Sequence, residues 1–132
     1  MDVHTIDEYY EENSVYKAIV ICDSDETAVE LTDTLRSKDY SVVLVSDEDV
    51  SSERPTYLEK ICWFPESMDR MLVITHSVFH DTYSYIQAYV LPHQNLIIFY
   101  NLDYNIVRLK TMKYLLESRT LGFLDDVNIL NT

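Results

Sequence analysis

Short apolar runs alternate with amphipathic segments along most of this chain. Runs rich in branched aliphatic side chains have the length and composition of buried β-strands, and they occupy residues 15–21, 40–45, 70–75, 95–100 and 127–130. Between them, apolar positions recur at helical spacing, which predicts helices within residues 23–39, 56–64, 77–89 and 104–119. An acidic loop is expected over 46–55.

This alternation of strands and helices predicts the class of the fold. A strand–helix–strand repeat is typical of a parallel sheet whose connecting helices cover both faces. We therefore expect one α/β domain over 15–132, with an open, mainly parallel sheet of about five strands and the last strand at an edge. Residues 1–14 are acidic and polar, which predicts a flexible lead-in or, alternatively, an acidic–aromatic segment that binds a partner.

Composition indicates a cytoplasmic protein with no membrane segment. The hydrophobic fraction of 47% is sufficient for a core, but no run approaches the roughly 20 apolar residues of a membrane-spanning helix. The N-terminus is acidic and does not resemble a signal peptide. Cys22 and Cys62 both lie beside apolar residues, which is typical of buried free thiols in a reducing compartment.

The charge of the chain disfavours nucleic acid as a partner without excluding RNA. The formal net charge is −13, and phosphate backbones bind basic surfaces. One basic stretch stands out and is the candidate contact for RNA or for an acidic partner; it contains Arg108, Lys110, Lys113 and Arg119. Gly122 is the single glycine, so the glycine-rich loop that usually cradles phosphates cannot form.

Four of the apolar runs resemble strand motifs of one known domain family. The matching segments are Lys17–Ser24, Tyr40–Leu44, Arg70–Thr75 and Asn95–Asn101. Their order and composition resemble the second RecA-like domain, the helicase C-terminal domain, of DEAD-box RNA helicases and their superfamily. The likeness covers about residues 15–130, and it implies a RecA-like α/β fold.

The loops depart from the motifs of that family. Val45-Ser46 stands where the family has His-Gly, and His76 stands where an Asp follows the family's Thr. The last motif of the family carries glycines and arginine fingers, whereas Asn105–Met112 has no glycine and offers only Arg108 and Lys110. The resemblance therefore implies a degenerate domain that is not an enzyme and binds no cofactor. Such domains occur in Yb-type Tudor-domain proteins of the piRNA pathway, where they serve self-association and assembly of RNA granules.

The first third of the chain also resembles a bacterial receiver domain. Asp23 and Asp25 could imitate the acidic pair that binds magnesium there. However, Thr75 occupies the position of the phosphoacceptor Asp, and residues 127–132 lack the lysine that the family requires. Phosphotransfer is the less favoured alternative.

Three small constellations have a chemical and a structural interpretation. His76 and His80 have a spacing that could share a metal on a helix, but two partly exposed histidines at a helix start are favoured. Clustered carboxylates at 23–26 could bind a divalent cation, but helix capping explains them. Cys62 could act as a nucleophile, but its apolar flanks favour burial. No metal site and no catalytic residue are predicted.

The aromatic residues provide the candidate surface. Eleven tyrosines occur, and the predicted helix 77–89 carries more aromatic side chains than one face can bury. Tyrosine is enriched at interfaces because it combines rigid apolar area with a polar tip. The predicted interface anchors are Phe79, Tyr83, Tyr85 and Tyr89. We expect self-association, as a homodimer or larger oligomer, or docking to another protein within an RNA pathway.

Overall fold

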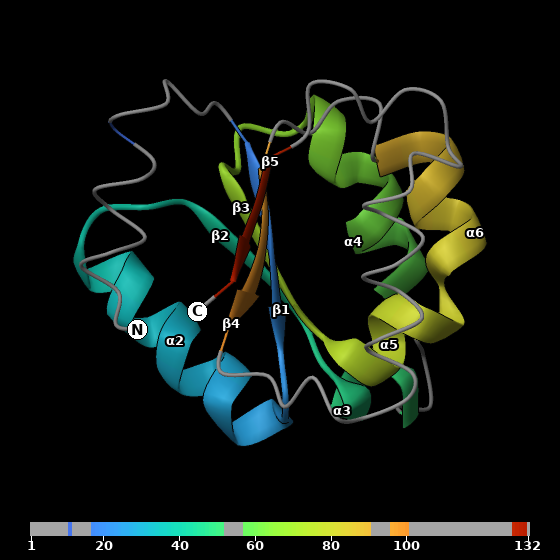
Figure 1. Cartoon of the computed structure of the whole chain (residues 1–132), viewed down its shortest axis with the longest axis horizontal. Coiled ribbons are helices and arrows are strands. Elements are labelled where there is room, and N and C mark those ends of the chain that lie inside the picture. Colours follow the sequence, from blue (N-terminus) through green and yellow to red (C-terminus); the bar gives the residue numbers. More distant parts are fainter. Residues whose placement is uncertain (1–10, 12–16, 52–56, 91–95, 101–127, 132) are drawn as a thin grey trace.

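Five parallel strands form the centre of the molecule (Figure 1). The computed structural model describes residue 11 and residues 17–51, 57–90, 96–100 and 128–131. The strands are β1 (Ala18–Cys22), β2 (Val42–Val45), β3 (Met71–Thr75), β4 (Leu96–Tyr100) and β5 (Asn128–Asn131). They lie in the order β2-β3-β1-β4-β5, and every neighbouring pair is parallel. The predicted sheet is confirmed, including the edge position of the last strand.

The strand order distinguishes between the two resembled folds. Receiver domains have the order 2-1-3-4-5, in which the first two strands are adjacent. Here β3 lies between β2 and β1, and it pairs with both. The receiver alternative is therefore wrong at the level of topology.

The two faces of the sheet carry separate clusters of buried side chains. Successive side chains of a strand point to opposite faces. Ile19 and Ile21 of β1 accordingly join one cluster, and Val20 and Cys22 join the other. All five residues of β1 are buried, which explains why this strand reads as a continuous apolar run rather than as an alternation.

Helices cover both faces of the sheet (Figure 1). Helix α2 (Asp25–Ser37) packs on one face, where its buried apolar residues join the cluster of Val20 and Cys22. The opposite face is covered by α4 (Tyr57–Trp63), η1 (Phe64–Glu66), α5 (His76–Asp81), α6 (Tyr83–Tyr85) and η2 (Ile86–Val90). The prediction of helices on both faces is confirmed.

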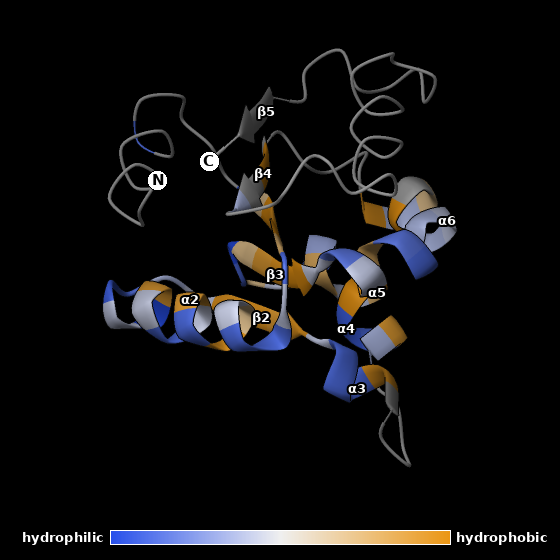
Figure 2. Ribbon diagram, turned by 60° about the horizontal axis from the view of Figure 1, so that its bottom comes forward, coloured by the Kyte–Doolittle hydropathy of each residue, from blue (hydrophilic) through white to orange (hydrophobic). Residues whose placement is uncertain are grey.

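Helix α2 shows how local sequence fixes an element. The hydroxyl of Ser24 accepts a hydrogen bond from the amide of Thr27 at 3.3 Å and caps the N-terminus. The buried face recurs at helical spacing through Ala28, Leu31 and Leu35; α2 accordingly alternates between hydrophilic and hydrophobic colours in Figure 2, whereas β2 and β3 are largely hydrophobic. The predicted capping of this helix is confirmed.

Two predicted elements differ from the structure. The expected acidic loop contains a short helix, α3 (Asp47–Ser51). The expected helix 77–89 is divided at Thr82, whose hydroxyl donates to the carbonyl oxygen of Val78 at 2.6 Å.

The predicted lead-in 1–14 falls almost entirely, and the predicted helix 104–119 entirely, outside the described residues. Among the helices that the structure describes, none is long and apolar enough to cross a membrane.

Candidate functional site

Acidic residues gather where three strands end at one edge of the sheet. Asp23 and Asp25 follow β1, Asp47 follows β2, and Thr75 ends β3. Open α/β sheets bind their ligands at the carboxyl ends of the strands. The carboxyl end of the sheet is therefore the first place to look for a functional site.

The carboxylates at the carboxyl end of the sheet accept hydrogen bonds from donors of the chain itself. Asp25 accepts hydrogen bonds from the backbone amides of Asp47 at 2.7 Å and Glu48 at 3.2 Å. The hydroxyl of Thr75 donates to the carboxylate of Asp47 at 2.8 Å. In related α/β folds, free backbone amides at this position bind the phosphate group of a ligand. Here two of those amides are occupied by a carboxylate, and the neighbouring negative charges repel an anion.

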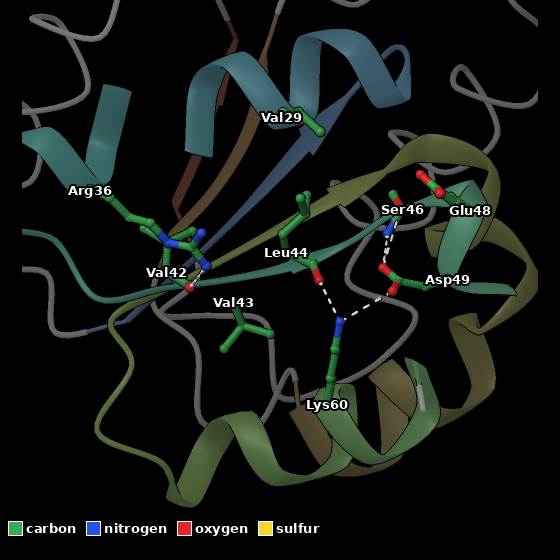
Figure 3. Close-up of a pocket in the computed structure, with 9 residues that line it drawn as sticks. All are labelled: Val29, Arg36, Val42, Val43, Leu44, Ser46, Glu48, Asp49 and Lys60. Carbon is green, nitrogen blue, oxygen red and sulfur yellow. Dashed lines mark hydrogen bonds and ion pairs between the residues drawn. The ribbon is translucent and has the colours of Figure 1, made fainter. Parts of the chain in front are cut away.

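A hydrogen-bonded cluster lies beside the carboxyl end of β2 and borders an open groove of about 700 Å³ (Figure 3). The carboxylate of Asp49 accepts from the amide of Ser46 at 2.8 Å and from its hydroxyl at 3.2 Å. The ammonium of Lys60 lies 3.2 Å from the same carboxylate. This arrangement fixes the turn between β2 and α3 and engages three of the polar residues that line the groove.

Two cations cover the outer side of β2 along the same groove (Figure 3). Within the described residues β2 pairs with β3 alone, so its other side is a sheet edge. Arg36, from α2, donates to the carbonyl oxygen of Val42 at 2.9 Å, and Lys60, from α4, donates to that of Leu44 at 3.3 Å. Charged side chains at an edge hinder pairing with another chain. The groove is thus a covered strand edge.

Sequence reasoning did not identify Arg36, Asp49 or Lys60. Their roles depend on β2 being an edge strand, which follows from the strand order. The local hydrophobic pattern carries no signal of that order, because buried runs look alike at the centre and at the edge of a parallel sheet.

The two histidines lie at the start of a helix and are at least partly exposed, as the favoured interpretation expected. His76 is half-buried in the first turn of α5, and the exposed His80 lies 3.3 Å from the carboxylate of Asp81. In the part of the chain that the structure describes, no group of three or more His, Cys, Asp or Glu side chains could hold a metal ion.

The two cysteines have different environments. Cys22 is fully buried, and burial, with a smaller contribution from the charge of Asp23, raises the pKa of its thiol to about 12. Cys62 is only half-buried. The prediction that both thiols are buried is confirmed for Cys22 and wrong for Cys62, because Cys62 lies near the end of α4, beside the exposed Trp63.

The predicted aromatic anchors divide between core and surface. Phe79 is fully buried in the core, so it is not available to a partner, and this corrects the predicted anchor set. Tyr83 is half-buried with its ring 5.8 Å from that of Phe79, and burial raises the pKa of its hydroxyl. Tyr85 and Tyr89 are 44% and 57% exposed, and their ring centroids lie 6.3 Å apart.

The exposed pair results from the spacing of the segment. Phe79, Ile86 and Val90 supply its buried side, and Tyr85 and Tyr89 are four residues apart, which places them together on a helical surface. The remaining candidates, Arg108, Lys110, Lys113 and Arg119, lie outside the described residues.

The fold is shared with helicase domains of known structure. The chain is similar to the Hef helicase domain of Pyrococcus furiosus, with a TM-score of 0.62 and 16% identity over 98% of this chain. It is also similar to the C-terminal domain of the DEAD-box protein Dbp5, with a TM-score of 0.53 and 14% identity over 98% of this chain and 83% of that domain. At such identities the likeness shows the fold alone.

The comparisons also set limits. This chain spans 23% of the length of the Hef structure. No family model matches the sequence, and no curated protein sequence matches it. The structural neighbours support the resemblance, and they support it at the level of the fold.

Proposed function

We propose that this domain is a non-catalytic interaction module with the fold of a helicase C-terminal domain. One observation carries the proposal: the carboxylate of Asp25 occupies the amides of Asp47 and Glu48 at the ligand edge of the sheet. A nucleotide phosphate would have to displace this carboxylate and approach several others. The departures from the helicase motifs at Val45-Ser46 and His76 lie at the same edge.

The surface proposed for self-association or docking is the tyrosine pair, Tyr85 and Tyr89. Both rings are exposed and lie close to each other, so they present apolar area with little conformational entropy to lose on binding. No charged residue lies between Thr82 and Val90, and depletion of charge is typical of the centre of an interface. The pair therefore fits a second copy of this chain better than it fits RNA.

For the cellular setting we propose that of the Yb-type Tudor-domain proteins, in which degenerate helicase C-terminal domains occur. That setting implies a cytoplasmic role in the assembly of RNA granules, with the piRNA pathway as the candidate process. RNA binding through Arg108, Lys110, Lys113 and Arg119 is the alternative, and it stays a prediction that filter binding at low salt can test.

Substitution of the tyrosine pair tests the proposed surface. Tyr85→Glu and Tyr89→Glu place a charge in an apolar contact, so each variant is expected to sediment at a lower mass than the wild type at equal concentration. Circular dichroism should stay native because both side chains are exposed.

Thr34→Glu is the matched control, since it adds the same charge to an exposed position on α2. It should associate as the wild type does. If the sedimenting mass of the control falls as far as that of the tyrosine variants, the effect is a general effect of charge, and the assignment of the tyrosine surface is contradicted.

A further inference from the structure

The most exposed large apolar side chains of the described residues lie in one short segment. Trp63, the single tryptophan of the chain, is 74% exposed at the end of α4, and Met68 is 91% exposed in the turn that leads to β3. Tryptophan is among the residues most enriched at the energetic centres of interfaces. The exposed indole of Trp63 is therefore a candidate contact for a partner.

Two open hollows flank Trp63. One, of about 270 Å³, is lined mainly by apolar surface that includes Val43 and Phe64. The other has a volume of about 380 Å³, and both hollows share Trp63 and Ser67 as lining residues. A side chain placed in either hollow would contact the indole from one side.

A buried lysine holds the turn that forms these hollows. The ammonium of Lys17 donates to the carbonyl oxygens of Phe64 at 2.6 Å, Ser67 at 2.9 Å and Asp69 at 2.6 Å. It also lies 4.4 Å from the centroid of the Phe64 ring. The turn is thereby tied to the first residue before β1, so a partner need not order it on binding, which lowers the entropic cost of association.

The exposed charges that line the two hollows are negative. Glu59 lines the first hollow and Glu66 the second, and both are exposed. Lys60 also borders the first hollow, but its ammonium is directed to the carbonyl oxygen of Leu44 and to the carboxylate of Asp49. The surface is therefore complementary to a cation.

We propose that the Trp63 surface, formed by Glu59, Trp63, Glu66 and Ser67, binds a short linear segment of another protein in which an arginine lies next to an apolar residue. A guanidinium stacks on an indole face and pairs with a carboxylate of Glu59 or Glu66, while the neighbouring apolar side chain enters a hollow. A second copy of a chain with net charge −13 is electrostatically the poorer occupant. The hollows are not lined by the tyrosine pair, so the two surfaces can be tested separately.

Selection from a library of random linear peptides displayed on phage tests this proposal. The full chain is immobilised, and the Trp63→Ser chain is added in solution as a competitor to remove peptides that bind elsewhere. We expect the enriched peptides to carry arginine beside an aliphatic or aromatic residue. Failure to enrich any peptide that depends on Trp63, or enrichment of sequences without a cation, would overturn the proposal.

The affinity of a selected peptide can be read from the fluorescence of Trp63 itself, because the chain has no other tryptophan. Glu59→Gln combined with Glu66→Gln should weaken binding about threefold, because the two substitutions remove both carboxylates with which the guanidinium can form its surface ion pair. Glu30→Gln combined with Asp33→Asn removes the same charge from exposed positions of α2 and should leave the affinity unchanged.

Equal weakening in both pairs would show non-specific attraction and would overturn the assignment. A shift of Trp63 emission on raising the chain concentration without peptide would assign the surface to a second copy and would also overturn it. Tyr89→Glu should bind the peptide as the wild type does, which separates this surface from the tyrosine pair.

Discussion

Asp39 illustrates how a single residue ends an element in a chain that has almost no glycine. It follows α2 and has a φ of 69°, a conformation that favours glycine but that Asp tolerates through local hydrogen bonds. Its amide donates to the carbonyl oxygen of Arg36 at 3.0 Å and closes the last turn of the helix. The end of α2 was predictable from Lys38-Asp39, whereas the positive φ was not.

Replacing this residue tests the strain at the helix end. Asp39→Gly is expected to raise the free energy of unfolding by about 0.5 kcal/mol, because relief of the left-handed conformation exceeds the added entropy of the unfolded chain. Lys38→Gly, at a position with a φ of −99°, should lower it by about 0.5–1 kcal/mol. Urea unfolding followed by circular dichroism measures both values, and a loss of stability in Asp39→Gly would refute this account.

The two thiols provide a second test at the scale of residues. Cys22 is buried with its pKa raised to about 12, so its thiol stays protonated and shielded at neutral pH. Cys62 is half-buried and should react with a thiol reagent in the native state. In the Cys62→Ser chain, we expect labelling only when denaturant unfolds the protein; prompt labelling under native conditions would argue against the burial of Cys22.

The raised pKa of Cys22 also gives stability a dependence on pH. The folded state holds the thiol proton more tightly than the unfolded state, whose thiol has the ordinary pKa of 9.0. The contribution is complete below pH 9.0 and is lost as the pH rises toward about 12.

Among the elements, the strands were predictable and α3 was not. Strands covered on both faces leave continuous apolar runs in the sequence, and β1 and β3 are buried throughout. Helix α3 is five residues long, and its first amides are capped by Asp25, which lies 22 positions earlier in the chain. A contact of that range leaves no mark in the local pattern, so the segment reads as an acidic loop.

The covered edge of β2 leads to a prediction about aggregation. Arg36 and Lys60 occupy carbonyl oxygens that an added strand would use. Arg36→Ala combined with Lys60→Met is therefore expected to increase the rate of thioflavin-positive aggregation several-fold while the folded spectrum is kept. Lys38→Ala combined with Arg70→Met removes the same charge elsewhere, and an equal rate in that control would contradict a protective role for the edge.

The whole molecule has the fold of a helicase domain, and at the carboxyl end of its sheet the carboxylate of Asp25 occupies the backbone amides of Asp47 and Glu48. The class of the fold could be derived from the alternation of strands and helices together with the resemblance, and the structural neighbours share the fold. The strand order, which excludes a receiver domain, came from the structure. The candidate surface could be derived only in part. The number of aromatic residues in the segment indicated that some must be exposed, as Tyr85 and Tyr89 are, but it could not show that Phe79 turns into the core.

The exposed Trp63 shows the same limit. In the sequence it extends an apolar run with Ile61 and Cys62, which favours burial of all three. In the structure Ile61 is buried and Trp63 is exposed, because α4 covers the sheet with one side only. Which residue of such a run faces solvent depends on the rotation of the helix against the sheet.

The proposed function requires the purified domain to associate, and light scattering over a range of concentrations measures this. We expect a mass that rises above the 15.6 kDa of one chain as concentration increases, and a mass of one chain when Tyr85→Glu and Tyr89→Glu are combined. A wild-type chain that keeps the mass of a monomer at the highest concentration reached would contradict self-association.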